Sequence, residues 1–320
     1  MNRRQFLAAS AAVAAVAANA SEENETVFPV IDTHQHLWDL SKFRLPWQKN
    51  EPKLAKNHLM SDYLAATADL GDMEGKPARI VKTVYMEVDV EPSQQTAEAQ
   101  YVLDLCSRAD NPMVAAVISG RPSADGFAKY LDAFTNSACI KGVRQVLHGP
   151  GTPAGYCLDK KFIHGIRLLG ERNLSYDLCM RPGELRDAAK LIDECPGTRF
   201  ILDHCGNGDV QAKDRSQWEK DMAAVAERKN VVCKVSGIVV TAKPERWTAD
   251  DLAPIIKHTL EVFGPDRVMF GGDWPVCTKT ASFRQWFQAL ASIVAGRSAE
   301  EKRNLFHDNA MRFYRLEGDE

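Results

Sequence analysis

The sequence lacks several features that define common functional classes. Its 40 basic and 43 acidic residues give a formal net charge of −3, and they are not gathered into a basic run or stripe. Because nucleic-acid-binding proteins usually carry such a patch, a nucleic-acid partner has no support. The expected first strand is not followed by Gly-x-Gly-x-x-Gly, the loop with which dinucleotide-binding folds hold a pyrophosphate.

Paired metal-binding or redox cysteines are also missing. The eight cysteines are scattered and contain no Cys-x-x-Cys pair. The sequence therefore indicates neither a zinc ribbon nor a thiol redox motif. Several cysteines lie inside apolar runs, as small buried hydrophobic residues do. Their number leaves open whether any of them pair as disulfides.

Long apolar runs are scarce, since no stretch beyond the N-terminus approaches the ~18 apolar residues of a membrane-spanning helix. The first twenty residues place Arg3 and Arg4 before an alanine-rich stretch that ends in Ala18-Asn19-Ala20. This pattern is typical of a cleaved signal peptide, and the paired arginines suggest twin-arginine export. An alanine-rich membrane anchor is the alternative. We expect a periplasmic protein whose residues 21–320 form one domain, without stable membrane association after cleavage.

The remainder of the chain alternates short apolar runs with longer stretches of helical period. The runs predict eight strands, at 27–32, 79–88, 113–119, 140–147, 174–180, 199–204, 231–237 and 267–272. Helices are predicted at 93–109, 123–135, 159–172, 183–194, 215–228, 250–263, 281–295 and 298–313, with Ser93 as the N-cap of the first. Eight buried strands alternating with helices predict a (β/α)8 TIM barrel. A doubly wound open sheet is the alternative.

Polar side chains fall where the predicted strands end, which is where such barrels carry their chemistry. His34 and His36 are two residues apart, so they face the same side of the first strand. Together with His204 and Asp273 they make a set able to bind one divalent ion or a substrate oxyanion. Asp273 is the candidate base for an attacking water. The alternative for Asp273 is a helix N-cap before Trp-Pro.

These residues resemble a known family. The stretches that carry the resemblance are DTHQHLWDL, LPW (45–47), GVRQVL, LSYDLCMRP, FILDHCG, CKVSGI, FGGDWPV and LFHDNAMRFYRL. In this order they are similar to the amidohydrolase superfamily of TIM-barrel hydrolases, and more narrowly to its sugar-lactonase branch. The resemblance implies a catalytic role for Asp273, as general base, and for His204, with His34 and His36 as the first-strand pair.

The sequence departs from the wider superfamily at two strand ends. The fifth strand ends in Cys179, Met180 and Arg181 with no histidine, and the fourth offers no lysine at the bridging position. A two-metal centre is therefore not expected. The resemblance implies one divalent ion, zinc or manganese, or a reaction without metal. The metal ligands would be His34, His36 and Asp273; Glu87 is a further candidate ligand or else a salt-bridge partner of Arg144.

The expected activity is hydrolysis of a lactone or similar cyclic ester of a sugar acid or a dicarboxylic acid. Arg144 and Arg181 are the candidate carboxylate-binding residues, because a guanidinium binds a carboxylate at two points; ion pairs within the protein are the alternative. Trp38, Trp47 and Tyr156 are expected to wall a substrate ring, or else to belong to the core. Four other histidines are interpreted as structural: His148, His164, His258 and His307.

Two other function classes are compatible with the same residues. A metal-dependent decarboxylase of an aromatic or unsaturated acid would use the same histidines and aspartate, and it would release carbon dioxide. A small-molecule binding protein on an inactive barrel would be expected to have lost one of the four central residues, yet all four are present. The sequence leaves the oligomeric state open.

Overall fold

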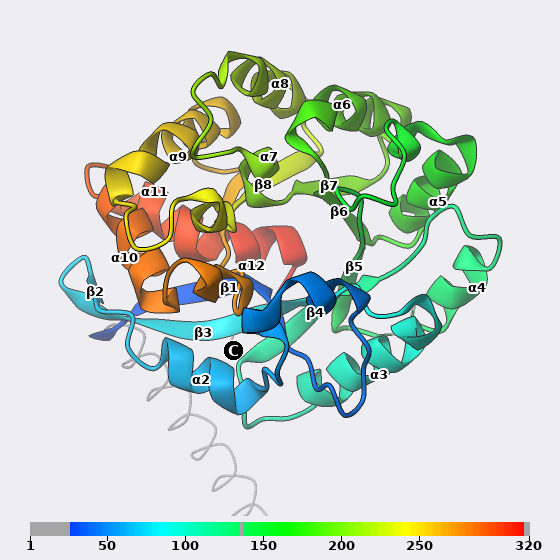
Figure 1. Cartoon of the computed structure of the whole chain (residues 1–320), viewed down its shortest axis with the longest axis horizontal. Helices are drawn as coiled ribbons and strands as arrows, with labels where there is room; N and C mark the ends of the chain where they lie inside the picture. The colour runs from blue at the N-terminus through cyan, green and yellow to red at the C-terminus, as the bar shows by residue number, and fades with distance from the viewer. Residues whose placement is uncertain (1–25, 135–136, 317–320) are drawn as a thin grey trace, which may run out of the picture.

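The computed structural model describes residues 26–134 and 137–316 (Figure 1). The predicted signal peptide and its cleavage site lie outside the described residues. Within these two ranges no helix combines the length and the apolar character needed to cross a bilayer.

Eight parallel strands form a nearly closed barrel, which confirms the predicted TIM-barrel fold. They are β1 (Phe28–Gln35), β3 (Lys76–Met86), β4 (Met113–Ser119), β5 (Ile140–Val146), β6 (Ser175–Cys179), β7 (Arg199–Leu202), β8 (Val231–Val235) and β9 (Val268–Phe270). Each strand pairs with the next one in the sequence. This order excludes a doubly wound sheet, in which the strand order reverses at a switch point.

A seam between the two ends of the chain completes the barrel. Gln35 at the end of β1 forms a parallel bridge with Trp274, just beyond β9. The backbone of His36 donates to the Trp274 carbonyl at 2.8 Å, and the backbone of Asp273 donates to the His34 carbonyl at 2.9 Å. The seam therefore brings together two of the segments that carry predicted site residues.

Helices surround the strands, as Figure 1 shows. The outer layer consists of α3 (Gln95–Cys106), α4 (Phe127–Asp132), α5 (Lys160–Glu171), α6 (Leu185–Glu194), α8 (Ser216–Ala226), α9 (Ala249–Phe263) and α10 (Phe283–Ile293). Side-chain caps mark several of these starts: the Asp159 side chain accepts from the first turn of α5, and Ser282 forms a capping box with Gln285 at α10. The prediction for Ser93 is wrong, because Ser93 lies in the 3₁₀ turn η3 (Pro92–Gln94) and Gln94 is the N-cap of α3.

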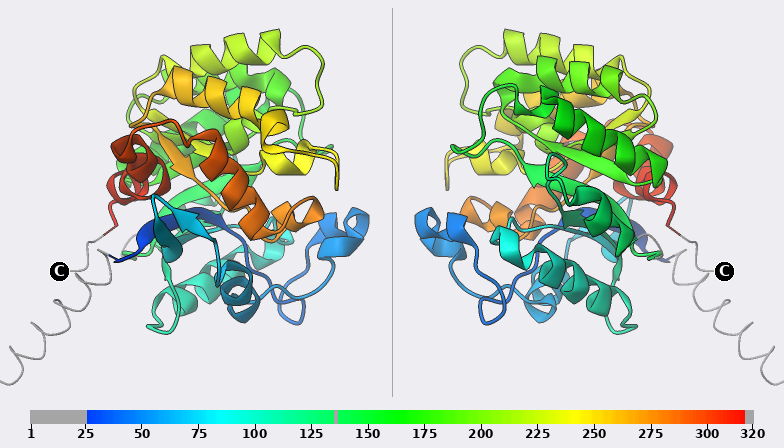
Figure 2. Two further views of the ribbon diagram at one scale, coloured as in Figure 1. Left: turned by 90° about the vertical axis from the view of Figure 1, so that its left-hand side faces the viewer. Right: turned by 90° about the vertical axis from the view of Figure 1, so that its right-hand side faces the viewer.

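The long segment after β1 is folded rather than extended. It contains η1 (Pro46–Asn50), η2 (Pro52–Leu54), α2 (Met60–Thr67) and β2 (Asp72–Met73), which pairs antiparallel with β3. Within this segment an isolated antiparallel β-bridge joins the backbones of Trp38 and His58. Figure 2 shows η1 and η2 at the opposite end of the molecule from α12 (Asn309–Tyr314). The segment therefore covers the end of the barrel at which β1 ends and His34 and His36 lie.

An apolar layer fills the barrel below those polar strand ends. It includes Ile31, Met86, Val117, Ile201 and Met269, and it is continued by Tyr314 of α12. A larger apolar cluster lies between the strands and the surrounding helices. Burial of both strand faces is typical of parallel sheets and explains the continuous apolar runs.

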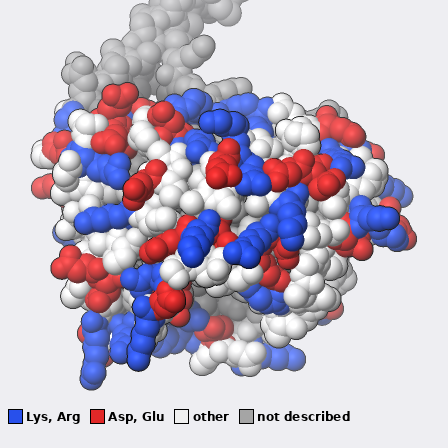
Figure 3. All heavy atoms as spheres, turned by 90° about the horizontal axis from the view of Figure 1, so that it is seen from above, with Lys and Arg blue, Asp and Glu red and all other residues white. Residues whose placement is uncertain are grey.

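Two of the eight cysteines form a disulfide. Cys106 at the end of α3 is bonded to Cys139, just before β5. The other six cysteines are buried free thiols, so their packing is that of small apolar side chains. On the face seen in Figure 3, acidic and basic side chains are interspersed and form no continuous basic area.

Candidate active site

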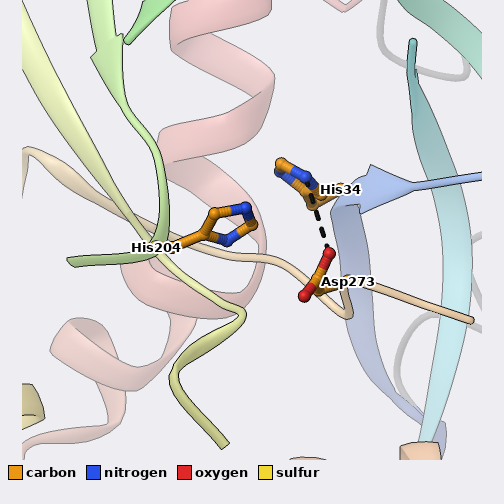
Figure 4. A group of neighbouring side chains, drawn as sticks. All are labelled: His34, His204 and Asp273. Carbon is orange, nitrogen blue, oxygen red and sulfur yellow. Dashed lines mark ion pairs between the residues drawn. The ribbon is translucent and has the colours of Figure 1, made fainter. Parts of the chain in front are cut away.

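Three segments far apart in the sequence bring His34, His204 and Asp273 together (Figure 4). His34 lies on β1, His204 begins the short helix α7 (His204–Asn207) after β7, and Asp273 follows β9. One ligand atom from each lies within 4.8 Å of the others. The structure thus joins predicted residues of the first, sixth and last barrel strands at one end of the barrel.

Both strand-1 histidines face Asp273. Nε2 of His36 lies 3.4 Å from Oδ1 of Asp273, and Nε2 of His34 lies 3.8 Å from the same oxygen. The pairing of β1 with β3 shifts register between Asp32 and Gln35. Such irregularities change the direction in which side chains point, and they are common next to active sites. Nδ1 of His36 is engaged elsewhere, at 2.9 Å from the Met86 carbonyl.

Two of the central residues have left-handed backbone conformations. φ is 54° at His204 and 52° at Asp273, values that cost a non-glycine residue free energy and that cluster at functional sites. Asp273 is not a helix cap, because the next helix, η7 (Val276–Lys279), has Pro275 as its N-cap and no side-chain cap bond. The N-cap alternative for Asp273 is therefore excluded.

Ser236, at the end of β8, orients His204. Its hydroxyl lies 2.9 Å from Nδ1 of His204, which leaves Nε2 for the site. The ring also packs on Gly237, whose φ is +63°; a β-carbon there would lie 2.3 Å from His204 Nδ1. Ser236 is among the polar residues expected at the strand ends, but no role was predicted for it or for Gly237, although both stand in the CKVSGI stretch.

Asp32 is a further residue that sequence analysis missed. Its Oδ1 accepts the backbone N–H of Gly272 at 2.7 Å and that of His34 at 2.9 Å, and its Oδ2 accepts the Tyr63 hydroxyl at 2.9 Å. Burial raises the pKa of Asp32, while these donors act in the opposite direction. The residue connects β1, α2 and the Gly271-Gly272-Asp273 turn, so it fixes the segments that carry the site.

A chain of buried charges runs beneath the histidines. Arg144 pairs with Glu87 at 2.7 Å and with Asp203 at 3.3 Å. Lys234 in turn lies 3.4 Å from Asp203 and 2.7 Å from Asp177. Despite its burial, the pKa of Asp203 lies well below its usual value because Lys234 and neighbouring groups favour the carboxylate.

This chain fixes the protonation of His34. Nη1 of Arg144 lies 3.3 Å from His34 Nε2. Because a guanidinium can only donate, Nε2 accepts, and the proton of the neutral ring is on Nδ1. Nδ1 faces Oδ1 of Asp203 at 3.5 Å. Burial lowers the pKa of His34 well below its usual value, so the ring is neutral at pH 7.

The two arginines predicted to bind substrate carboxylates are both in ion pairs. Arg144 is buried and bonded to Glu87 and Asp203 as described. Arg181 pairs with Glu184 at 3.0 Å and donates to the Gly149 and Thr152 carbonyls at 2.6 and 2.7 Å. Their role toward substrate stays a prediction, while the alternative of internal pairing is present in both cases.

The predicted aromatic walls differ in their exposure. Trp38 is fully buried, donates to the Lys56 carbonyl and packs edge-on against Trp47 at 5.5 Å. Trp47 and Tyr156 are half-buried; Trp47 donates to the Val88 carbonyl. Trp38 therefore belongs to the core of the first loop, whereas the other two retain partly exposed surface.

The remaining histidines separate into two groups. His258 and His307 bond to the Glu219 carbonyl and the Asp308 carboxylate, in keeping with structural roles. His58 is buried edge-on against Trp38 and Trp274, and burial lowers its pKa to about 4.

His148, beyond β5, is exposed. Desolvation and the neighbouring His204, Arg144 and Arg181 lower the pKa of His148 to about 4. Its predicted structural role stays a prediction. His164, on α5, is exposed.

The residues fit a single divalent ion better than a pair. His34, His204 and Asp273 offer two imidazole nitrogens and one carboxylate, which suits zinc or manganese. An ion would take the Nε2 lone pair of His34 in place of the Arg144 N–H. Glu87 lies outside this group, because its Oε1 is bonded to Arg144 and its Oε2 accepts the Asp89 N–H at 2.7 Å. Cys179, Asp203 and His204 form a second close group, but it shares His204 with the first.

The sequence and the fold of this chain are both similar to those of known proteins. The family model described as Amidohydrolase matches residues 31–316. An L-fucono-1,5-lactonase of Burkholderia multivorans is 27% identical, with 89% of this chain and 96% of that protein covered. An L-rhamnono-gamma-lactonase of Scheffersomyces stipitis is 21% identical, with 90% and 99% covered. A crystal structure of a Burkholderia multivorans amidohydrolase with bound zinc superposes with a TM-score of 0.77 at 25% identity, covering 90% of this chain and 99% of that one.

Proposed function

The chain belongs to the amidohydrolase family, and we propose that it hydrolyses a lactone, or a similar cyclic ester, of a sugar acid or a dicarboxylic acid. The observation that carries this proposal is the convergence of His34, His36 and His204 on the Asp273 carboxylate at one end of the barrel. A carboxylate beside imidazoles can accept a proton from water, which is the first requirement of ester hydrolysis. The similarity to two lactonases supports the choice of a cyclic ester.

Asp273 takes a proton from water as the water oxygen attacks the lactone carbonyl carbon. The carbonyl oxygen gains negative charge, and His204, whose Nδ1 is held by Ser236, stabilises it through Nε2. The ring C–O bond then breaks, and the departing alkoxide receives the proton held by Asp273. One water is consumed and one hydroxy acid is formed. A divalent ion held by His34, His204 and Asp273 would polarise the carbonyl when bound.

The test is a screen of aldonolactones and dicarboxylate lactones with the purified protein, with metal analysis alongside. Asp273→Asn keeps the size of the side chain but cannot accept the proton, so we expect the rate to fall by about 10² to 10⁴. Circular dichroism controls for folding. Full activity of the Asn variant on a confirmed substrate would show that Asp273 is not the base. Stoichiometric carbon dioxide release would instead identify a decarboxylase.

We also propose that the protein is exported to the periplasm through the twin-arginine route. The paired Arg3 and Arg4 before an apolar stretch support this, and so does the Cys106–Cys139 disulfide, since disulfides persist in oxidising compartments. Replacing Arg3 and Arg4 together by lysine is expected to abolish delivery, as measured by cell fractionation. Unchanged delivery would contradict the route.

A further inference from the structure

The arginines around the candidate site are neutralised by the protein itself. Arg121 lies just beyond β4, Arg144 near the end of β5, and Arg181 just beyond β6. These are the positions from which a guanidinium could bind an acidic group on a substrate, as the sequence suggested for two of them. In each case the guanidinium donates hydrogen bonds to acceptors within the protein.

Arg144 is the most firmly held of the three. Its Nε donates to Glu87 Oε1 at 2.7 Å, and its Nη2 donates to the Glu87 carbonyl at 2.8 Å. Its Nη1 contacts Asp203 and His34, both at 3.3 Å. The side chain is only 5% exposed. A substrate carboxylate could reach it only by displacing a buried carboxylate, which would leave that group without its cation.

Arg181 and Arg121 are more exposed but also paired. Arg181 faces both carboxylate oxygens of Glu184, at 3.1 and 3.0 Å, and two carbonyls of the loop after β5. Arg121 bonds to Asp89 at 3.0 Å and to the Gly120 carbonyl at 3.0 Å. In both side chains the terminal nitrogens already donate to acceptors of the protein, so they are not free to bind a substrate carboxylate at two points.

The carboxylate at the centre of the site also opposes an acidic substrate. The Asp273 carboxylate lies at that centre, and like charges that approach within a few ångströms repel each other. His148 is different: it follows β5, the strand that carries Arg144, and its ring is exposed. A neutral imidazole can donate or accept a hydrogen bond, which suits a hydroxyl group.

We propose that the substrate is an uncharged, polyhydroxylated lactone, and that pairing of Arg181 with Glu184 is a determinant that excludes lactones carrying a carboxylate. This inference rests on the proposed lactone hydrolysis and narrows its substrate class. Glu184 acts as a positioning residue, since it contacts Arg181 rather than the reacting atoms.

The first test compares two lactones that differ in one group. An aldono-1,4-lactone ends in a hydroxymethyl group, and the aldaro-1,4-lactone of the same stereochemistry ends in a carboxylate. For several such stereochemical pairs we expect kcat/KM of the wild-type protein to be at least about tenfold higher for the uncharged member, the equivalent of one charge-assisted hydrogen bond.

The second test uses Glu184→Gln. Glutamine preserves the shape and can still accept the weak Gly155 N–H bond at 3.4 Å, but it no longer neutralises Arg181. We expect kcat/KM for the aldarolactone to rise on the order of tenfold, mainly through a lower KM, with little change for the aldonolactone. Glu194→Gln is the matched control, because it releases the exposed Arg167 elsewhere on the protein.

The possible outcomes separate the two proposals. Equal or greater wild-type activity on the aldarolactones would overturn the inference while leaving lactone hydrolysis intact. A Glu184→Gln variant with unchanged selectivity would overturn the role of the Arg181–Glu184 pair. Hydrolysis of no lactone in the whole panel would overturn the proposed function itself.

Discussion

Ser236 determines which nitrogen of His204 faces the site. Its hydroxyl contacts Nδ1 at 2.9 Å, so loss of the hydroxyl frees the ring to rotate or change tautomer. We predict that Ser236→Ala lowers kcat by about 10- to 100-fold, the usual effect of removing a partner that orients a catalytic histidine. KM should change much less, because Ser236 is not expected to contact substrate. Steady-state kinetics on a confirmed lactone measure both constants.

The control for this prediction is Ser175→Ala. Ser175 is also a buried serine, and its hydroxyl donates to the Lys141 carbonyl at 3.2 Å. It stands at the start of β6 rather than at a strand end near the site, so its loss should leave kcat unchanged. Wild-type kcat in the Ser236 variant would show that other contacts suffice to orient His204.

Single residues were predictable from the sequence when their role depends on strand position. His34, His36 and Asp273 are polar groups that directly follow apolar runs, so a strand-end location could be assigned without knowing their neighbours. Asp32 stands within such a run and bonds to Gly272, 240 positions away. No local pattern indicates a partner at that separation, and the importance of Asp32 emerges only when β1 and β9 come together.

At the scale of elements, Glu98 connects α3 to the strand beside it. Its Oε1 accepts the Tyr85 hydroxyl and the Val88 N–H, while Oε2 is buried with no partner in the described residues. Burial, assisted by the Glu87 carboxylate, raises the pKa of Glu98 from 4.5 to about 8. The side chain is therefore a neutral acid at pH 7.

This raised pKa predicts a pH dependence of stability. Between pH 4.5 and about 8 the folded chain holds a proton that the unfolded chain has lost, so the free energy of unfolding falls as the pH rises. Glutamine imitates the neutral acid and has no proton to lose. We predict that Glu98→Gln weakens this pH dependence, with its largest stabilisation relative to wild type at the upper end of the window.

Denaturant unfolding across the window measures this effect. The matched control is Glu261→Gln, which alters an exposed glutamate of α9 and should keep the wild-type slope. Identical slopes in wild type and the Glu98 variant would mean that Glu98 is ionised in the folded protein at neutral pH.

Element boundaries were less predictable than element types. The apolar runs located every barrel strand, because burial on both faces requires them. The start of α3 was misplaced, because Pro92 begins a separate 3₁₀ turn and Ser93 falls inside it. The last predicted helix, 298–313, is divided into α11 (Ala299–Arg303), a π turn at Asn304–Asp308 and α12.

For the whole molecule, alternation of eight apolar runs with helices was enough to predict the barrel, since few other architectures bury so many consecutive strands. The charges inside it were harder to interpret. Arg144 and Arg181 were expected to bind substrate, with internal ion pairs as the alternative. Glu184 stands only three positions after Arg181, but Glu87 and Asp203, the partners of Arg144, come from strand ends that the sequence does not place beside it. The availability of a charged group depends on its complete set of partners, which only the three-dimensional arrangement supplies.

The seam between β1 and the segment after β9 has a consequence for the order of folding. Thr33 donates to the Phe270 carbonyl across 237 positions, and Asp273 meets His34 across nearly the same span. Contacts of such long sequence separation form late, after the entropy of closing the intervening chain has been overcome. A ribosome-bound chain that lacks its last fifty residues does not contain Asp273, the proposed base. Activity is thus acquired in the same event that finishes the barrel, and catalysis itself becomes a measure of complete folding.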